Sequence, residues 1–305
     1  MSRVVDSVLN LVGGTPLVRL RRLPRRQSAD VLVKLETLNP AGSLKDRIAL
    51  EMVVEAERQG RLRPGATIVE PTSGNTGVGL AMVAAVKGYR LILTMPEDMS
   101  IERRRLLARY GAEFVLTPAS EGMTGAVRAA KRLLAEHPNY FMPQQFANPA
   151  NPQIHRLTTG PEILAATDGR VDAFVAGVGT GGTLTGVAQA LQGELPHVRI
   201  VAVEPASSPV LQGGRASAHG IQGIGPSFVP EVFDRALVDE IIAVSDEDAY
   251  ATSVRLMREE GISAGVSSGA AVFAALAVAE RLGTQRTVVT VVADTAERYL
   301  SLAIV

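Results

Sequence analysis

A lysine stands at the expected start of a helix, in the segment Asn39–Arg47. Ser43 is expected to cap this helix, with Asp46 three residues later as its capping-box partner, and the helix is expected to cover Asp46–Arg58. The helix dipole disfavours a cation in the first turn, which pushes Lys45 toward the neutral amine that forms a Schiff base with a carbonyl group. The alternative is a surface lysine whose charge Asp46 and solvent balance.

A glycine-containing loop, Glu70–Gly77, follows an expected strand and opens an expected helix at Val78–Lys87. The N-terminus of a helix presents unpaired backbone N–H groups and a partial positive charge, so it binds anions. With its hydroxyl groups the loop is a candidate cradle for a carboxylate; the hydroxyls belong to Thr72, Ser73 and Thr76. The alternative is a plain helix start whose hydroxyls bond to their own backbone.

The second glycine-rich loop, Gly177–Thr183, also lies between an expected strand and an expected helix. Its glycines would let the backbone approach a phosphate group closely. They also spell GxGxxG, and Glu204 follows Gly182 at about the spacing of a ribose-binding acid, so a nicotinamide-dependent oxidoreductase remains an alternative. Lys45 and the first loop count against it, because a simple dehydrogenase requires neither.

Two further segments contain candidate site residues. Ser267 and Ser268 precede an alanine-rich helix expected at Ala270–Arg281, and either serine could be its N-cap. The segment Gly220–Gly225 has three glycines in six residues, which is typical of a turn or of a mobile active-site loop.

Composition excludes several classes of function. The 305 residues include 31 basic and 31 acidic side chains, a balance that argues against a nucleic-acid partner. There is no cysteine, and the four histidines lack the spacing of metal ligands, so no metal is expected. No signal peptide is expected, and the long uncharged runs 173–193 and 261–279 are broken by Gly, Ser or Thr, so we predict no membrane span and a cytoplasmic location.

Apolar β-branched runs alternate with helical segments along the chain, which predicts an α/β fold with mostly parallel strands. The expected strands are Leu17–Leu20, Val31–Leu35, Thr67–Val69, Arg90–Met95, Glu113–Leu116, Ala173–Ala176, Arg199–Val203 and Thr287–Val292. Other expected helices are Ile101–Tyr110 and Gly125–Glu136, and the stretch Asn148–Pro152 is the best candidate for a domain crossing.

These motifs, in this order, resemble the O-acetylserine sulfhydrylase (cysteine synthase) family of tryptophan-synthase-β-like, fold type II pyridoxal phosphate enzymes. The resemblance runs nearly end to end. The segments that carry it are Gly13–Leu17, Gly42–Arg47, Thr72–Gly77, Met95–Glu97, Gln144–Phe146, Thr159–Glu162, Gly177–Thr183, Gln222–Gly225 and Glu297–Ser301.

The resemblance implies two domains, each a twisted, mostly parallel sheet flanked by helices, with the cofactor in the cleft between them. The smaller N-terminal domain would contain residues 1–12 and 36–147, and the larger C-terminal domain residues 13–35 and 148–305.

The resemblance also assigns roles to individual residues. Lys45 would bind pyridoxal 5′-phosphate as a Schiff base and later carry the α-proton of the substrate. Asn75 would bind the ring hydroxyl and Ser267 the pyridine nitrogen. The cofactor phosphate would be held by Gly179, Thr180, Gly181, Gly182 and Thr183. The substrate would be held by Thr72, Ser73, Gly74, Thr76, Gln145 and Gly223, with Gln144 the weaker candidate of the glutamine pair.

The implied reaction is a β-replacement that makes L-cysteine from O-acetyl-L-serine and sulfide, in a homodimer that could bind the tail of serine acetyltransferase. Relatives that use O-phosphoserine carry an arginine near the third glycine loop, which corresponds to Gly220–Gly225 in this chain. Gly220–Gly225 has none, and Arg215 is the nearest cation upstream, which favours O-acetylserine. A cystathionine β-synthase, an O-phosphoserine sulfhydrylase and a catalytically silent amino-acid-binding relative remain as alternatives.

Overall fold

The computed structural model describes residues 4–300, whose contacts group into two compact units. Unit 1 contains the described residues up to Val12 together with Lys45–Ala150, and unit 2 contains Gly13–Leu44 and the chain from Asn151 onward. Ser301, the last residue of the Glu297–Ser301 motif, lies outside the described residues.

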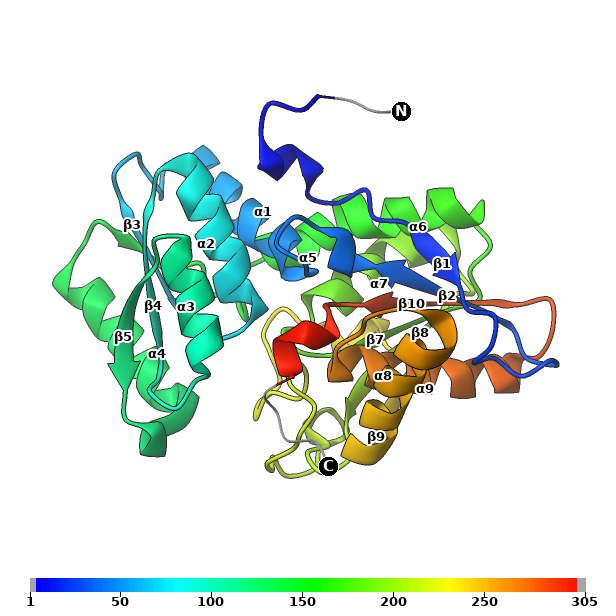
Figure 1. The fold of residues 1–305 in the computed structure, drawn as a ribbon. Helices are drawn as coiled ribbons and strands as arrows, with labels where there is room; N and C mark the ends of the chain where they lie inside the picture. The colour runs from blue at the N-terminus through cyan, green and yellow to red at the C-terminus, as the bar shows by residue number, and fades with distance from the viewer. Residues whose placement is uncertain (1–3, 301–305) are drawn as a thin grey trace. The chain divides into compact units, whose positions relative to one another are not determined.

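Unit 1 is built on a four-stranded parallel sheet in the order β5-β4-β3-β6 (Figure 1). The strands are β3 (Thr67–Pro71), β4 (Arg90–Pro96), β5 (Glu113–Thr117) and β6 (Tyr140–Phe141). The α-helices are α1 (Lys45–Arg58), α2 (Asn75–Lys87), α3 (Ile101–Arg109) and α4 (Gly122–Glu136), and short 3-10 turns lie at Val8–Leu11 and Ala119–Glu121.

The two faces of this sheet are covered by different helices. Val69 and Ile92 pack with Ala130 of α4 on one face. Successive residues of a strand point to opposite faces, so Glu70 and its strand partner Leu93 point to the other face. A Cβ atom at Gly77 of α2 would lie 3.2 Å from Leu93 Cδ1, which identifies this other face as the one that α2 covers.

Unit 2 contains a six-stranded sheet in the order β1-β2-β10-β7-β8-β9, in which β1 runs antiparallel to β2 and the other pairs are parallel. The strands are β1 (Leu17–Arg19), β2 (Asp30–Leu35), β7 (Ala173–Gly177), β8 (Arg199–Pro205), β9 (Glu240–Val244) and β10 (Thr287–Val292). The α-helices are α5 (Ala150–Ile154), α6 (Gly160–Thr167), α7 (Gly182–Glu194), α8 (Asp246–Glu260) and α9 (Val266–Leu282). A π-helical turn, His155–Thr159, joins α5 to α6, and 3-10 turns lie at Glu36–Leu38, Val210–Gln212, Arg235–Leu237 and Ala296–Tyr299.

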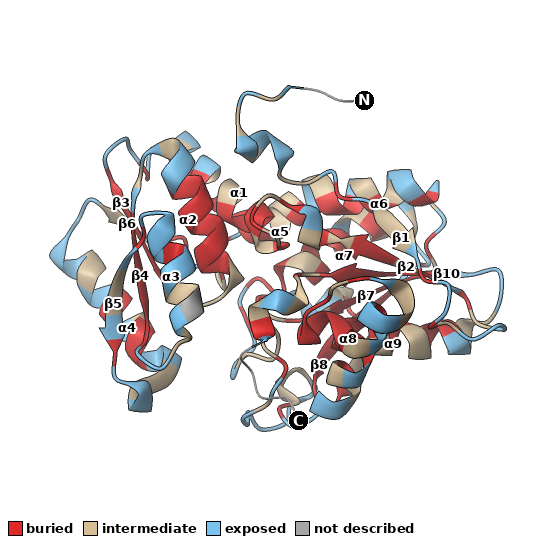
Figure 2. Ribbon diagram, viewed as in Figure 1, coloured by how far each residue is buried: buried red, intermediate tan, exposed pale blue. Residues whose placement is uncertain are grey.

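Helices cover both faces of this second sheet, as parallel strands require. Val288 and Val175 point toward α8 and α9, whereas Val289 and Phe174 point toward α6 and α7. Figure 2 shows the central strands buried along most of their length. These two sheets confirm the predicted α/β class, and each predicted strand is present with ends within about two residues of the observed ones, the usual uncertainty of such boundaries.

Four predicted helix starts were wrong. α2 begins at Asn75 and α4 at Gly122, each three residues before the predicted start. α9 begins at Val266 with Gly265 as its N-cap, so neither Ser267 nor Ser268 is the cap. α1 begins at Lys45, so Leu44 directly precedes it and Ser43 lies one residue further out, in an isolated β-bridge with Asp294. α9 therefore begins four residues earlier than predicted, and α1 begins one residue earlier.

Residues 36–44 group with unit 2, whereas the resemblance placed them in the smaller domain. The Leu44 N–H donates to the Ala293 carbonyl oxygen at 2.9 Å, and the Arg298 guanidinium donates to the Ala41 carbonyl oxygen. These bonds attach the segment before Lys45 to the residues that follow β10. The other unit boundary, between Ala150 and Asn151, lies within the predicted crossing segment.

Within the described range of residues 4–300, no helix is both long enough and apolar enough to cross a lipid bilayer. The two uncharged runs that could be mistaken for spans each contain a loop, because β7 ends before α7 begins and a turn precedes α9.

Candidate active site

Lys45 is the first residue of α1, in the first turn as predicted, and is half-buried. Its position in unit 1 is shaped by α2. A Cβ atom at Gly79 of α2 would lie 2.9 Å from Ala49 Cβ and 3.1 Å from the Lys45 carbonyl oxygen. A glycine at this point therefore lets α2 pack directly against the first turn of α1.

The other three lysines have positions that do not suit a nucleophilic amine. Lys34 is fully buried, and its Nζ lies 2.7 Å from both Glu162 Oε2 and the Thr15 carbonyl oxygen. Lys87 pairs with Glu57 at 2.8 Å near the C-terminus of α2, and Lys131 is exposed on α4. Among the four lysines, Lys45 is the one at a helix start.

The first loop leads into α2 without a side-chain cap, because Gly74 is the N-cap residue. The first-turn N–H groups of such a helix have no intrahelical acceptors and can bind an anion. Thr72 Oγ1 accepts a hydrogen bond from the Gly74 N–H at 3.3 Å. The alternative of hydroxyls bonded to their own backbone thus applies to Thr72, whose hydroxyl proton can still be donated to a ligand.

Thr76, Gln145 and Glu70 lie together in unit 1. Thr76 Oγ1 donates to Gln145 Oε1 at 2.6 Å, and both side chains are buried. Glu70, at the end of β3, accepts the Gln145 N–H at 3.1 Å and the Gln144 N–H at 3.0 Å. Burial raises the pKa of Glu70 to about 7, against the opposing effect of the two N–H donors. No motif in the sequence singles out Glu70.

The neighbouring residues Gln144 and Gln145 of unit 1 differ in burial and in backbone conformation. Gln145 is buried beside Thr76, whereas Gln144 is exposed and has a φ of 57°, in the left-handed region. This difference agrees with the preference for Gln145 as the substrate ligand.

In unit 2, the second loop leads into α7, again without a side-chain cap, and its N-cap Gly181 has a φ of 85°. Thr180 Oγ1 accepts hydrogen bonds from Asn151 Nδ2 at 3.0 Å and from the Gly182 N–H at 3.4 Å. Thr180 is therefore buried within the loop and orients its start.

Three glycines of this loop tolerate no side chain. A Cβ atom at Gly179 would lie 2.2 Å from the Gly223 carbonyl oxygen, and one at Gly181 would lie 2.6 Å from Phe233 Cβ. One at Gly182 would lie 1.8 Å from Asn151 Oδ1. The result is a helix N-terminus in a loop made almost wholly of backbone, a fit for the phosphate of pyridoxal 5′-phosphate.

Thr183 belongs to a buried chain of polar groups. Its Oγ1 lies 3.2 Å from His155 Nε2, and His155 Nδ1 lies 2.8 Å from Thr159 Oγ1. His155 is fully buried, so it fixes the direction of the Thr183 hydroxyl. A lone histidine in the sequence carries no spacing signal, and for that reason sequence analysis assigned it no role.

Ser267 is the second residue of α9, and only 7% of it is exposed. A Cβ atom at Gly223 would lie 3.6 Å from Ser267 Oγ. The third glycine loop is also attached to the second one, because the Gly225 N–H donates to the Val178 carbonyl oxygen at 2.9 Å. Unit 2 thus brings together both of its glycine loops and Ser267.

Glu204, the candidate ribose-binding acid, is already bonded within unit 2. It is 1% exposed and accepts the Leu211 N–H at 2.7 Å and Gln212 Nε2 at 3.1 Å. These bonds hold the turn after β8, so the geometry does not support a dinucleotide site.

The predicted residues divide between the two units. Unit 1 holds Lys45, the segment Thr72–Thr76 with Asn75, and Gln145; unit 2 holds Gly179–Thr183, Gly223 and Ser267.

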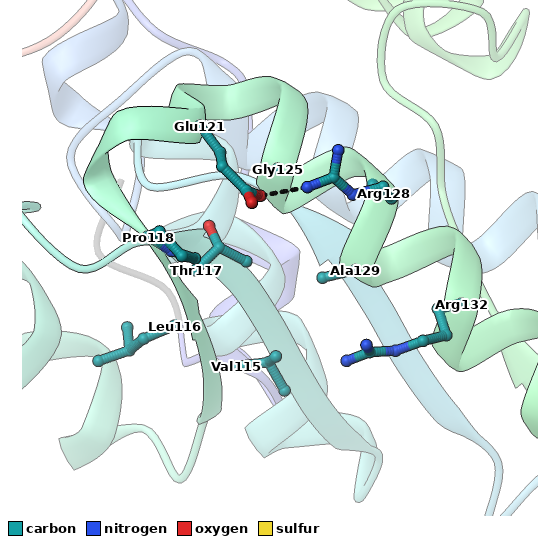
Figure 3. Close-up of a pocket in the computed structure, with 9 residues that line it drawn as sticks. All are labelled: Val115, Leu116, Thr117, Pro118, Glu121, Gly125, Arg128, Ala129 and Arg132. Carbon is teal, nitrogen blue, oxygen red and sulfur yellow. Dashed lines mark hydrogen bonds and ion pairs between the residues drawn. The ribbon is translucent and has the colours of Figure 1, made fainter.

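A depression of about 340 Å³ lies elsewhere on unit 1, between β5 and α4 (Figure 3). Its lining residues are Val115, Leu116, Thr117, Pro118, Glu121, Gly125, Arg128, Ala129 and Arg132. The Glu121–Arg128 ion pair lies at its rim, and none of the predicted site residues contributes to it.

The chain was compared with known proteins. The model of a family described as pyridoxal-phosphate dependent enzyme matches residues 8–294. A cysteine synthase of Staphylococcus aureus is 56% identical over 298 residues, which cover 97% of this chain and 96% of that protein.

Solved structures agree. A cysteine synthase from Entamoeba histolytica has a TM-score of 0.95 and 42% identity, covering 98% of this chain and 90% of that one. An O-ureido-L-serine synthase has a TM-score of 0.95 and 47% identity, covering 98% and 94%. The family match leaves no place for the nicotinamide-dependent alternative: the chain belongs to the pyridoxal-phosphate dependent enzyme family.

Proposed function

We propose that this enzyme makes L-cysteine from O-acetyl-L-serine and sulfide by β-replacement on pyridoxal 5′-phosphate. The observation that carries the proposal is Lys45, a half-buried lysine in the first turn of α1, against which α2 packs at Gly79. Identity of 56% to a protein named cysteine synthase supports the choice of reaction.

Each unit contributes distinct groups to the proposed chemistry. When bound, the cofactor supplies an electron sink that makes the α-proton of an amino acid acidic. The first-turn N–H groups of α7 and the hydroxyl of Thr183 would hold its phosphate, the Asn75 amide its ring hydroxyl, and the Ser267 hydroxyl its ring nitrogen. Glycine at positions 179, 181 and 182 lets this loop pack directly against Gly223, Phe233 and Asn151, where a side chain would collide.

Lys45 would act twice through Nζ. It would hold the cofactor covalently, and as a free amine it would take the α-proton of the amino acid and later return it. Its place in the first turn favours the neutral amine at both stages, since the helix dipole opposes a charged one. Acetate leaves the β-carbon and sulfide takes its place.

The substrate carboxylate would lie at the start of α2. Its proposed ligands are Thr72, Ser73, Gly74, Thr76, Gln145 and Gly223. Replacing Thr76 with Ala should leave the cofactor bound. It should raise the KM for O-acetylserine about two- to tenfold, the effect of losing one hydrogen bond, because Thr76 also orients Gln145. Spectral titration and steady-state kinetics measure both quantities, and loss of cofactor from Thr76→Ala would contradict this division of roles.

Ser267→Asp should change turnover without changing the fold. A neutral hydroxyl beside the ring nitrogen leaves that nitrogen largely unprotonated, whereas a carboxylate would hold a proton on it and lower the rate by about tenfold or more. The second position of a helix accepts Asp readily because of the dipole.

The matched control for Ser267→Asp is Ser268→Ala. Ser268 Oγ accepts the Ala293 N–H at 2.9 Å, so this variant should lose thermal stability and keep its turnover. Melting curves and cysteine-forming rates are measured for both variants. Full activity of Ser267→Asp would contradict the proposed contact between Ser267 and the ring nitrogen.

The choice of substrates needs a direct comparison. We expect kcat/KM to be highest with O-acetylserine and sulfide. O-phosphoserine is tested in place of O-acetylserine, and homocysteine and hydroxyurea are tested in place of sulfide. Hydroxyurea would give O-ureido-L-serine by the same replacement. A higher kcat/KM with any of these would redirect the proposal to that reaction.

We also propose a cytoplasmic homodimer that binds the C-terminal tail of serine acetyltransferase. Support comes from the family resemblance alone. Sedimentation of the purified enzyme, with and without a synthetic tail peptide, tests both associations.

A further inference from the structure

Glu70 is a buried carboxyl group that the proposed chemistry does not use. It is the last residue but one of β3, directly before the anion loop, and 1% of it is exposed. It points to the α2 face of the sheet, as its strand partner Leu93 does. A buried carboxyl group needs hydrogen-bond donors to be tolerated.

Its two oxygens accept the N–H groups of two successive residues. Oε2 accepts from Gln144 and Oε1 from Gln145, at 3.0 Å and 3.1 Å. Gln144 has a left-handed φ of 57°, a conformation that a residue with a side chain keeps only when its surroundings enforce it. The forked carboxyl group supplies that enforcement, since both N–H groups must point the same way to reach it.

Fixing the Gln145 backbone also places the Gln145 side chain. With its backbone fixed, Gln145 presents Oε1 to the Thr76 hydroxyl at 2.6 Å, in the first turn of α2. We propose that Glu70 is a positioning residue, which sets the affinity for the substrate carboxylate by fixing the Gln144–Gln145 turn against Thr76. This role rests on the proposed function, because Gln145 and Thr76 are its substrate ligands.

Glu70 is 1% exposed, and this burial raises its pKa to about 7 against the opposing effect of its two N–H donors.

The test is Glu70→Gln in the cofactor-loaded enzyme. The amide has one acceptor oxygen, and its NH₂ group would face one of the two N–H donors. The KM for O-acetylserine should rise about tenfold, as for the loss of a well-placed hydrogen bond. kcat and the cofactor content should stay near wild-type values.

Glu204→Gln is a matched control. Glu204 is also 1% exposed, also precedes a proline at the end of a parallel strand, and also accepts a loop N–H, but in unit 2. It should lose thermal stability and keep the wild-type KM. Should Glu70→Gln fail to fold, Glu70→Asp, which keeps the charge with a shorter reach, is measured in its place.

The outcomes separate cleanly. A raised KM in the Glu70 variant alone supports the positioning role. A wild-type KM in a folded Glu70 variant overturns the positioning role, and so does an equal rise of the KM in Glu70→Gln and Glu204→Gln. Both results leave the proposed function standing. Wild-type enzyme that forms no cysteine overturns the proposed function and this role with it.

Discussion

Lys45→Ala is expected to abolish covalent attachment of the cofactor and to lower the rate of cysteine formation by about 10²–10⁴-fold or more, the contribution of a general acid–base group. The structure favours this lysine over the others. Lys34 is buried against Glu162 and Lys87 is paired with Glu57, whereas Lys45 lies half-buried at the start of α1. The measurement is borohydride reduction of the wild type and the variant, followed by peptide mapping.

Lys131→Ala is the control, because Lys131 is exposed on α4 and should contribute nothing to either quantity. Recovery of the reduced cofactor on any lysine other than Lys45 would contradict the assignment. So would an unchanged cysteine-forming rate in Lys45→Ala.

Gly181→Ala should release the cofactor from the enzyme. Gly181 has a φ of 85°, and a Cβ atom there would lie 2.6 Å from Phe233 Cβ and 3.0 Å from its Cα. The backbone must therefore move at the N-terminus of α7, where the phosphate is proposed to bind. We expect the cofactor dissociation constant to rise at least about tenfold, since the helix-terminal N–H groups must be well placed to hold a dianion.

Gly213→Ala separates this effect from simple backbone strain. Gly213 has a similar φ of 83°, and no atom lies within 4 Å of the position of an added Cβ. Both variants should lose about 1–2 kcal/mol of folding stability, because alanine is strained in the left-handed region. Only Gly181→Ala should lose cofactor. Equal cofactor loss in both variants, or none in either, would show that the Gly177–Thr183 loop does not bind the phosphate.

Local sequence signals were sufficient for most of the framework. Runs such as Thr287–Val292 are apolar and β-branched throughout, and a parallel strand buried on both faces requires that composition. Two strands escaped prediction: β6 has only two residues, and β9 is only partly buried, with Glu240 at its start. β6 is too short to form a run, whereas residues 241–244 of β9 form a short apolar run that was passed over.

Candidate site residues could be proposed from the sequence where glycines and hydroxyls cluster in the chain. Contacts between residues that are distant in the chain were not predictable. Glu70 and Gln145 are 75 residues apart, and His155 reaches Thr183 across 28 residues. Such bonds depend on how strands and helices pack. The capping errors at Ser43 and Ser267 have the same origin, because a β-bridge to Asp294 engages Ser43 and Gly265 begins α9.

The central claim is β-replacement on a cofactor held by this chain, and the visible spectrum of the purified protein tests it most directly. The protein should show a Schiff-base band. O-acetylserine alone should shift this band, and later addition of sulfide should restore it, with one cysteine and one acetate released per cycle. A protein loaded with pyridoxal 5′-phosphate whose band does not respond to O-acetylserine, or responds but forms no cysteine with sulfide, would contradict the account.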